Sequence, residues 1–353
     1  MNASDRQRGI RFCLAWLLIC GIIAPPARAF DAIHAFGDSL TDTGNEPAPV
    51  AGYFQGRYSN GQLWIEYLSP QLGFGYNAAN NLARSGTETS DALAQVRNFP
   101  APTNAASALF VIWSGGNDFI HNFSQGLNDA FWNSLIPQSV SNISNAVEIL
   151  YADGARTILV PNLVDLSRIP LALDSGLPSL ALTYLRGKVN QFDSSLASAL
   201  ASIAQAHSDL QLIRPDVYTQ FNSLLGNLVA NGFTKADPDA LTDPQLIDKS
   251  FTGPGADYVF WDPIHPTTKA HALIAQWFLS ALPAPQPRLS IVTGGGGFQL
   301  TLGDLQSGQV YTLQTSSNLV EWSDSTTVTA TNTAQPWAVS SGGSPVMFFR
   351  IKH

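Results

Sequence analysis

Cysteine is almost missing from this chain, which has only Cys13 and Cys20 among its 353 residues. Both lie near the N-terminus, in a segment that we expect to be removed from the mature protein. The mature chain is therefore predicted to contain neither a disulfide nor a cysteine nucleophile, and its stability must come from packing.

Charged residues are also scarce, at 12% of the chain, whereas hydrophobic residues make up 45%. This balance argues against a disordered chain and allows a sizeable core. The net charge is −8, and no stripe of Lys and Arg is present. Because nucleic-acid binding needs clustered positive charge, no nucleic-acid partner is expected.

Long hydrophobic runs are absent except near the N-terminus, where Phe12–Ala24 follows three arginines and precedes a small-residue site ending at Ala29. This order is typical of a secretory signal peptide over residues 1–29, and the run is short for a membrane-spanning helix. We expect cleavage near Ala29, export to the periplasm or the medium, and no transmembrane anchor in the mature chain. A lipoprotein form acylated at Cys20 is disfavoured, because bulky Ile19 stands where such signals need a small residue.

Short apolar runs alternate with longer helical patterns between residues 30 and 282. Such runs are typical of strands buried on both faces of a parallel sheet. The predicted strands are Ala32–Phe36, Ala108–Trp113, Thr157–Val160, Leu210–Ile213 and Tyr258–Phe260. The predicted helices are Gln62–Leu72, Val140–Tyr151, Leu180–Ala206 and Thr268–Leu282. This alternation predicts a three-layer α/β/α sandwich with a central, mostly parallel sheet.

The sequence changes character after residue 282. A proline-rich linker over residues 283–288 leads into residues 289–353, which are rich in Thr, Ser, Gly and Val and have no helical pattern. We expect a small all-β module there, with strands over Phe298–Leu302, Val310–Thr315 and Val346–Ile351. Trp322 and Trp337 are suited to stacking on sugar rings, but a module this small needs them for its core, which we favour.

Three polar motifs follow predicted strands, where sites form in open α/β sheets. They are Gly37-Asp38-Ser39-Leu40, Gly115-Gly116-Asn117-Asp118 and Trp261-Asp262-Pro263-Ile264-His265. Each alone has an ordinary structural interpretation: a helix cap, an Asx turn, or a cap followed by a surface histidine. Together they offer a serine, an amide donor, and a histidine with an orienting carboxylate, as acyl transfer requires.

In order and spacing these motifs resemble the GDSL, or SGNH, serine hydrolases. A further block around Gly86, in Asn81-Leu82-Ala83-Arg84-Ser85-Gly86-Thr87, resembles the family's second block, although it is bulkier and more polar than usual. The resemblance extends from Phe30 to about Leu282. The extended first block and Tyr58-Ser59-Asn60-Gly61 are most similar to the lipase-like branch.

The resemblance implies a role for each matching residue. Ser39 would be the nucleophile, His265 the general base and Asp262 its orienting carboxylate. The backbone N–H groups of Ser39 and Gly86 and the side-chain amide of Asn117 would form the oxyanion hole. The chemistry implied needs no metal and no organic cofactor.

The leading hypothesis is an exported esterase or lipase acting on a small-molecule or lipid ester. A carbohydrate acetyl esterase is the alternative, with the β module as an appendage that contacts carbohydrate or the cell surface. A catalytically inactive binding protein on the same scaffold and an acyltransferase are further alternatives.

Two loops are predicted to wall the substrate pocket, Gly44–Arg57 and Phe119–Pro137. Their aromatic residues suggest an apolar acyl site. These aromatic residues are Tyr53, Phe54, Phe119, Phe123, Phe131 and Trp132. His121, just past the Asn117 motif, is a weaker candidate for the same site.

Overall fold

The computed structural model describes residues 30–283, 287–294, 297–303, 305, 308–332, 334–337 and 347–352. The expected signal peptide, including Cys20, and residues 284–286 of the expected linker lie outside the described residues. The chain divides into two compact units, one up to Ala284 and the other from Pro285 onward.

Four parallel strands form the sheet of the first unit, in the order β1-β2-β3-β4. The strands are β1 (Ile33–Gly37), β2 (Leu109–Trp113), β3 (Thr157–Leu159) and β4 (Gln211–Ile213). The register pairs Ile33 with Leu109 and Gly37 with Trp113. The carboxyl ends of β1 and β2 therefore lie side by side, which brings the segments after Gly37 and Trp113 together.

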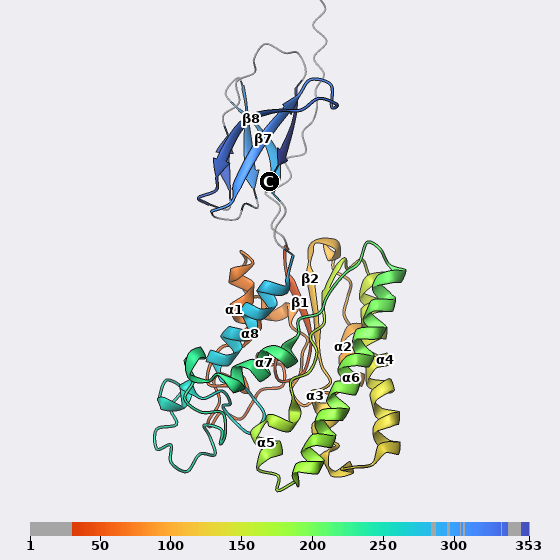
Figure 1. Cartoon of the computed structure of the whole chain (residues 1–353), viewed down its shortest axis with the longest axis vertical. Coiled ribbons are helices and arrows are strands. Elements are labelled where there is room, and N and C mark those ends of the chain that lie inside the picture. The colour runs from red at the N-terminus through yellow and green to blue at the C-terminus, as the bar shows by residue number, and fades with distance from the viewer. Residues whose placement is uncertain are drawn as a thin grey trace, which may run out of the picture. The chain divides into compact units, whose positions relative to one another are not determined.

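Helices cover both faces of this sheet (Figure 1). They are α1 (Trp64–Gln71), α2 (Thr89–Arg97), α3 (Gly116–Ile120), α4 (Asp129–Ala152), α5 (Pro170–Leu173), α6 (Ser179–Ala206), α7 (Val217–Gly226) and α8 (Thr268–Ala281). Alternate residues of β2 face opposite ways: Phe110 and Ile112 join a core with α2, α4 and α6, whereas Val111 joins a core with α1 and α8. The expected α/β/α sandwich is confirmed.

The sheet has one strand fewer than the sequence predicted. The run Tyr258–Phe260 is buried, but within the described residues it forms only isolated bridges, to Lys235 and Pro266. The N–H of Val259 donates to the carbonyl of Lys235 at 2.8 Å, and its carbonyl accepts from Thr267 at 2.9 Å. Because these loop partners already satisfy its backbone, the run braces the turn before α8 instead of extending the sheet.

The predicted helices are present, with one large difference in extent. Helices α1, α6 and α8 match their predicted ranges to within two residues, whereas α4 begins at Asp129, eleven residues before the predicted start at Val140. Pro137 lies inside α4. Because proline disfavours a helix interior, the sequence before Val140 predicted a loop and not the first half of this helix. The sequence patterns also missed α2 and α7, which are short.

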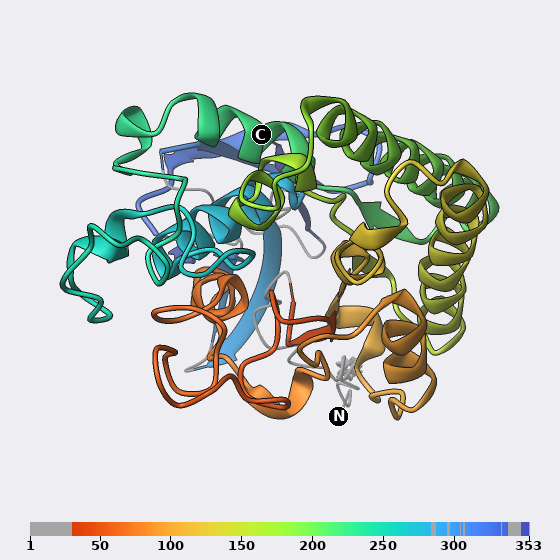
Figure 2. The ribbon, with the colours of Figure 1, turned by 90° about the horizontal axis from the view of Figure 1, so that it is seen from below.

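Two loop segments far apart in sequence lie side by side next to the sandwich (Figure 2). One precedes α1, and the other joins α7 to α8. The indole N–H of Trp261 donates to the carbonyl of Gly52 at 2.7 Å, and the amide of Asn60 donates to the carbonyl of Phe251 at 2.9 Å. These contacts fix the turn that carries the Asp262 and His265 motif.

The described residues of the second unit form two three-stranded antiparallel sheets, ordered β10-β7-β8 and β5-β6-β9. The strands are β5 (Arg288–Gly294), β6 (Gly297–Gly303), β7 (Val310–Ser316), β8 (Ser323–Thr329), β9 (Gln335–Trp337) and β10 (Phe348–Lys352). The expected all-β character is thus confirmed. Trp322 is not in the described core, contrary to expectation. Its ring is half-buried beneath the guanidinium of Arg350, 4.2 Å from its centroid, while leucines and Tyr311 form that core.

Candidate active site

The loop after β1 carries the serine motif. Gly37, at the end of β1, has φ +145°, and a Cβ there would lie 2.0 Å from the carbonyl oxygen of Trp113. Only glycine fits this close approach of β1 to β2. The chain then turns, with the N–H groups of Thr41 and Asp42 donating to the carbonyl of Asp38 at 3.0 Å. Ser39 lies in this turn at the carboxyl edge of the sheet and is 7% exposed.

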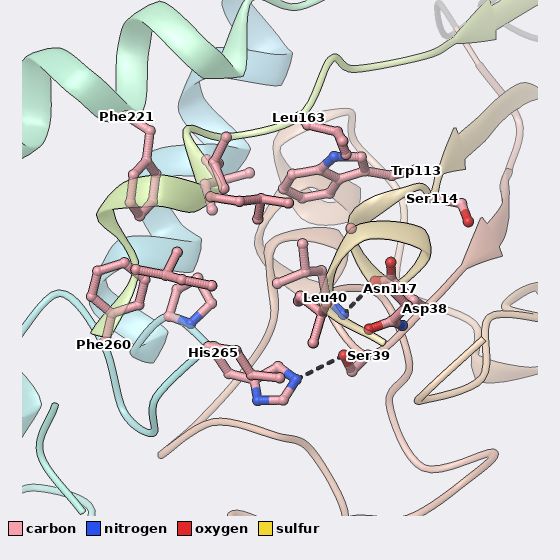
Figure 3. Close-up of a pocket in the computed structure, with 18 residues that line it drawn as sticks. Asp38, Ser39, Leu40, Trp113, Ser114, Asn117, Leu163, Phe221, Phe260 and His265 are labelled. Carbon is pink, nitrogen blue, oxygen red and sulfur yellow. Dashed lines mark hydrogen bonds between the residues drawn. The ribbon is translucent and has the colours of Figure 1, made fainter. Parts of the chain in front are cut away.

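Ser39, His265 and Asp262 form a continuous hydrogen-bonded chain. His265 Nε2 lies 2.7 Å from Ser39 Oγ, as the dashed line in Figure 3 shows, and His265 Nδ1 lies 2.7 Å from Asp262 Oδ2. A carboxylate only accepts hydrogen bonds, so Nδ1 carries the proton and Nε2 accepts from the Ser39 hydroxyl. The structure therefore brings together three residues from opposite ends of the first unit.

The Asp262 carboxylate is held ionised within this turn. Its Oδ1 accepts hydrogen bonds from the backbone N–H groups of Ile264 at 2.9 Å and His265 at 2.8 Å. Burial works to raise the pKa of Asp262, but the facing His265 and these hydrogen bonds outweigh it and hold that pKa below its usual value. An ionised Asp262 stabilises the protonated form of His265.

Gly86 lies at an exposed turn held by Asp42. Gly86 has φ +78°, a conformation that favours glycine. The residue before it, Ser85, donates to Asp42 Oδ2 from its backbone at 2.8 Å and from its hydroxyl at 3.1 Å. The same carboxylate accepts from Gly44 and Asn45 in the serine loop. Asp42 thereby ties the Ser39 loop to the Gly86 turn, a role that the sequence motifs did not reveal.

Asn117 lies on α3, buried beside Ser39. Its side-chain amide donates one hydrogen bond to the carbonyl of Thr87 at 2.8 Å, which fixes the orientation of the amide and leaves its second hydrogen free of that bond. The backbone N–H groups of Ser39 and Gly86 have no hydrogen-bond partner among the described residues. Ser39 and Asn117 both line the same pocket, whereas Gly86 is not among the residues that line it.

Asp38 is a second buried carboxyl group at the site. Burial raises its pKa to about 6, against the hydrogen bond from the Leu40 N–H and the attraction of His265, and nearby Asp118 adds to the rise. The sequence marked Asp38 only as part of the serine motif.

An apolar pocket opens directly beside Ser39, Asn117 and His265 (Figure 3). Much of its wall comes from the segment between β3 and α5, with further side chains from α7 and from the turn before His265. The principal wall residues are Leu163, Val164, Leu166, Ile169, Phe221 and Ile264. A site with this lining excludes water from the space beside the serine and suits a hydrocarbon group.

The predicted pocket walls were wrong in most respects. None of the six aromatic residues named from the two loops lines this pocket, although Ile120 of the second loop does. Phe119 and Trp132 stack in the core at 5.2 Å, and Phe54 packs against Phe251. His121 does not line the pocket either, and its Nδ1 pairs with Glu88 at 2.9 Å on the surface. The segment after β3 carries no polar motif, so nothing in the sequence marked it as a wall.

Tyr53 has a role that the sequence reasoning missed. The sequence predicts a pocket aromatic at this position, whereas in the structure the Tyr53 hydroxyl donates to Asp262 Oδ2 at 2.8 Å. Its neighbour Tyr58 packs its ring against that of His265, with centroids 4.8 Å apart. Both residues belong to the loop before α1, which therefore contacts the histidine and its carboxylate directly.

Within the described residues, no group of three His, Cys, Asp or Glu side chains is placed to hold a metal ion. In the same part of the chain, none of the helices combines the length and hydropathy needed to cross a bilayer.

The sequence is similar to known esterases, lipases and acyltransferases. The sequence matches the GDSL-like Lipase/Acylhydrolase family over residues 33–278. One relative is a GDSL esterase/lipase of Arabidopsis thaliana, 24% identical over 335 residues, covering 75% of this chain and 92% of that protein. Another is a phosphatidylcholine-sterol acyltransferase of Aeromonas hydrophila, 26% identical over 330 residues, covering 75% of this chain and 94% of that protein.

Among solved structures, a lipase from a goat rumen metagenome is similar, with a TM-score of 0.42 and 16% identity. The match covers 71% of this chain and 96% of the lipase. The family match spans well over half of the sequence and includes every motif described above. This chain belongs to the GDSL-like lipase/acylhydrolase family and is a carboxylic ester hydrolase.

Proposed function

We propose that this enzyme hydrolyses aliphatic acyl esters through a Ser39–His265–Asp262 triad. The observation that carries the proposal is the continuous hydrogen-bonded chain from Ser39 Oγ through His265 to Asp262, with both links at 2.7 Å. Ser39 Oγ attacks the ester carbonyl while His265 Nε2 takes its proton. His265 then gives that proton to the leaving alcohol, and an acyl-enzyme remains.

Water completes the reaction by the same route. His265 Nε2 takes a proton from water as its oxygen attacks the acyl carbonyl, and then returns that proton to Ser39 Oγ as the acid leaves. Asp262, which accepts from Nδ1, stabilises the imidazolium formed in both steps. The N–H groups of Ser39 and Gly86 and the amide of Asn117 bind the oxyanion. Their lack of other partners, or their spare hydrogen in the case of Asn117, supports this assignment.

The acyl group of the substrate is proposed to lie in the apolar pocket. Leu163, Val164 and Phe221 offer no hydrogen bonds there and suit a chain of several methylene groups. An acetyl group is too short to contact most of this wall. We therefore expect the enzyme to prefer esters of longer acyl chains over acetyl esters.

Export is part of the same proposal. The basic and apolar leader over residues 1–29 supports cleavage near Ala29 and function outside the cytoplasm. The mature enzyme would then comprise the hydrolase domain over residues 30–282, the linker over residues 283–288 and the β module over residues 289–353.

The test is ester hydrolysis by the mature protein, residues 30–353, on p-nitrophenyl esters from acetate to palmitate. We expect activity that rises from acetate to medium chains and disappears in Ser39→Ala. Ser144→Ala is the matched control, because its hydroxyl on α4 is buried without a hydrogen-bond partner. Folded wild-type protein without activity on any ester, or a Ser39→Ala variant with full activity, would contradict the proposal.

A further inference from the structure

The carboxylate of Asp262 has four hydrogen-bond donors, and one of them comes from a distant segment. Oδ1 accepts from the N–H groups of Ile264 and His265. Oδ2 accepts from His265 Nδ1 at 2.7 Å and from the Tyr53 hydroxyl at 2.8 Å. Three donors belong to the turn of Asp262 itself, whereas Tyr53 lies 209 residues earlier in the chain. Tyr53 and His265 therefore compete for the same oxygen.

The loop that carries Tyr53 is fixed on both sides of this residue. The carbonyl of Gly52 accepts the indole N–H of Trp261, at 2.7 Å. The N–H of Phe54 donates to the carbonyl of Ser59 at 2.9 Å. The Tyr53 ring packs against Tyr58 with centroids 5.1 Å apart. These contacts hold the Tyr53 hydroxyl against Asp262.

The Tyr53 hydroxyl is a neutral donor at neutral pH. Burial and the adjacent Asp262 charge raise the pKa of its hydroxyl above the ordinary value, so it keeps its proton at neutral and moderately alkaline pH. A neutral donor draws electron density toward its own side of Oδ2 and weakens the attraction of that oxygen for the imidazolium.

We propose that Tyr53 is a positioning residue that sets both the orientation of the Asp262 carboxylate and the basicity of His265. This inference rests on the triad proposed above. It assigns to the loop before α1 a share in tuning the general base, in addition to its packing role.

Other charged or titratable groups also face this cluster. Asp38 and His271 act electrostatically on His265, and Asp239 acts on both Tyr53 and Asp262. Tyr58 packs against both rings. A substitution at Tyr53 that keeps the ring leaves all four groups in place, so a change in the pH profile reports the hydroxyl itself.

The experiment compares wild-type protein, Tyr53→Phe and Tyr258→Phe on the best p-nitrophenyl ester, from about pH 5 to about pH 9. Tyr258 is the matched control because its hydroxyl donates to another aspartate, Asp243 Oδ2, also at 2.8 Å, and not to a residue of the triad. In Tyr53→Phe, Asp262 should attract the imidazolium more strongly. We expect the acid limb of kcat/KM to move upward by about half a pH unit.

We also expect kcat on the plateau to fall roughly 3- to 10-fold through poorer orientation, with little change in KM. In Tyr258→Phe, the acid limb of the pH profile of kcat/KM should stay where it is in the wild-type protein. An unchanged limb in Tyr53→Phe, with only a lower melting temperature, would show that Tyr53 merely packs and would overturn the inference.

A second readout does not need turnover. The proton on His265 Nδ1 should move downfield in the NMR spectrum of Tyr53→Phe, as its bond to Asp262 strengthens, and His265 should titrate at higher pH. If wild-type protein proved inactive on esters, the triad proposal would fail while this titration still tested Tyr53. An unchanged His265 titration in Tyr53→Phe would refute the role of Tyr53 whatever the activity.

Discussion

The Asn117 side chain is expected to affect kcat more than KM. The Asn117 amide is fixed by the carbonyl of Thr87, so its remaining hydrogen is directed without a further loss of freedom. Asn117→Ala should lower kcat by a factor on the order of 10²–10³ and change KM little, because an oxyanion donor acts mainly in the transition state. Steady-state kinetics would show this.

Asn122→Ala is the control for that measurement. The Asn122 amide also donates to a backbone carbonyl, that of Asp118, but Asn122 does not line the pocket. Equal losses of kcat in the two variants would argue that Asn117 acts only through local structure.

A half-buried carboxyl outside the triad, that of Asp193, governs part of the pH dependence of stability. Burial raises the pKa of Asp193 to about 7, against the hydrogen bond from the Leu163 N–H, and Asp216 adds to the rise. The Asp193 carboxyl of the folded protein therefore keeps a proton that the unfolded chain releases near pH 4. The contribution of the protonated carboxyl to the free energy of unfolding is fully present below about pH 4 and is lost as the pH rises through about 7.

Asp193→Asn should weaken that pH dependence, because an amide does not ionise and its oxygen still accepts from Leu163. The urea midpoint of wild-type protein should fall between about pH 5 and about pH 8, and that of Asp193→Asn should fall less. Asp153→Asn, at an exposed position after α4, should behave like wild type. Parallel pH curves for Asp193→Asn and wild type would contradict this account.

For single residues, the sequence predicted those in the motifs but not the residues that contact and orient them. Ser39, Asn117, Asp262 and His265 each lie in a short contiguous motif. The structure brings Ser39, Asn117 and His265 to one pocket, and Asp262 is hydrogen-bonded to His265. The contact of Tyr53 with Asp262 spans 209 residues and depends on how two loops meet, which no local pattern encodes.

Among the secondary-structure elements, the segment between β3 and α5 decides the shape of the pocket. Val164 lines the pocket and is only partly buried, so a larger side chain there can fill the pocket without disrupting the core. Val164→Trp should reduce kcat/KM for octanoate and longer esters by at least about 10-fold while changing the acetate value by less than about 3-fold. The chain-length profile of p-nitrophenyl esters is the measurement.

Val229→Trp, at a surface position that is 86% exposed, is the control. A uniform loss across all chain lengths in Val164→Trp would mean that the substitution disturbs the triad and not the acyl pocket.

Element prediction succeeded where periodicity was strong and failed where tertiary contacts decide. Helices α6 and α8 have long apolar stripes, and the sequence predicted their bounds to within two residues. The run Tyr258–Phe260 has the composition of a buried strand, but loops on either side take its hydrogen bonds. The short helix α7 supplies Phe221 to the pocket, yet no motif marks it.

For the whole molecule, every residue of the triad and of the pocket belongs to the first unit. Both cores that hold the sheet lie there as well. A protein ending at residue 283 should therefore fold and hydrolyse p-nitrophenyl esters with kcat and KM within about 2-fold of the mature enzyme, since domains with their own cores fold alone.

Circular dichroism and steady-state kinetics of the two proteins would check this expectation. A shortened protein that folds but loses activity would assign the β module a direct part in catalysis.

The order of the triad along the chain has a consequence for biosynthesis. Ser39 lies at the start of the first unit, and His265 lies 226 residues later, just before the final helix. A nascent chain emerging from the ribosome carries its nucleophile long before its base exists. On the mechanism proposed above, the enzyme therefore stays latent until His265 has been synthesised, and a chain truncated by premature termination before His265 should be an inert polypeptide.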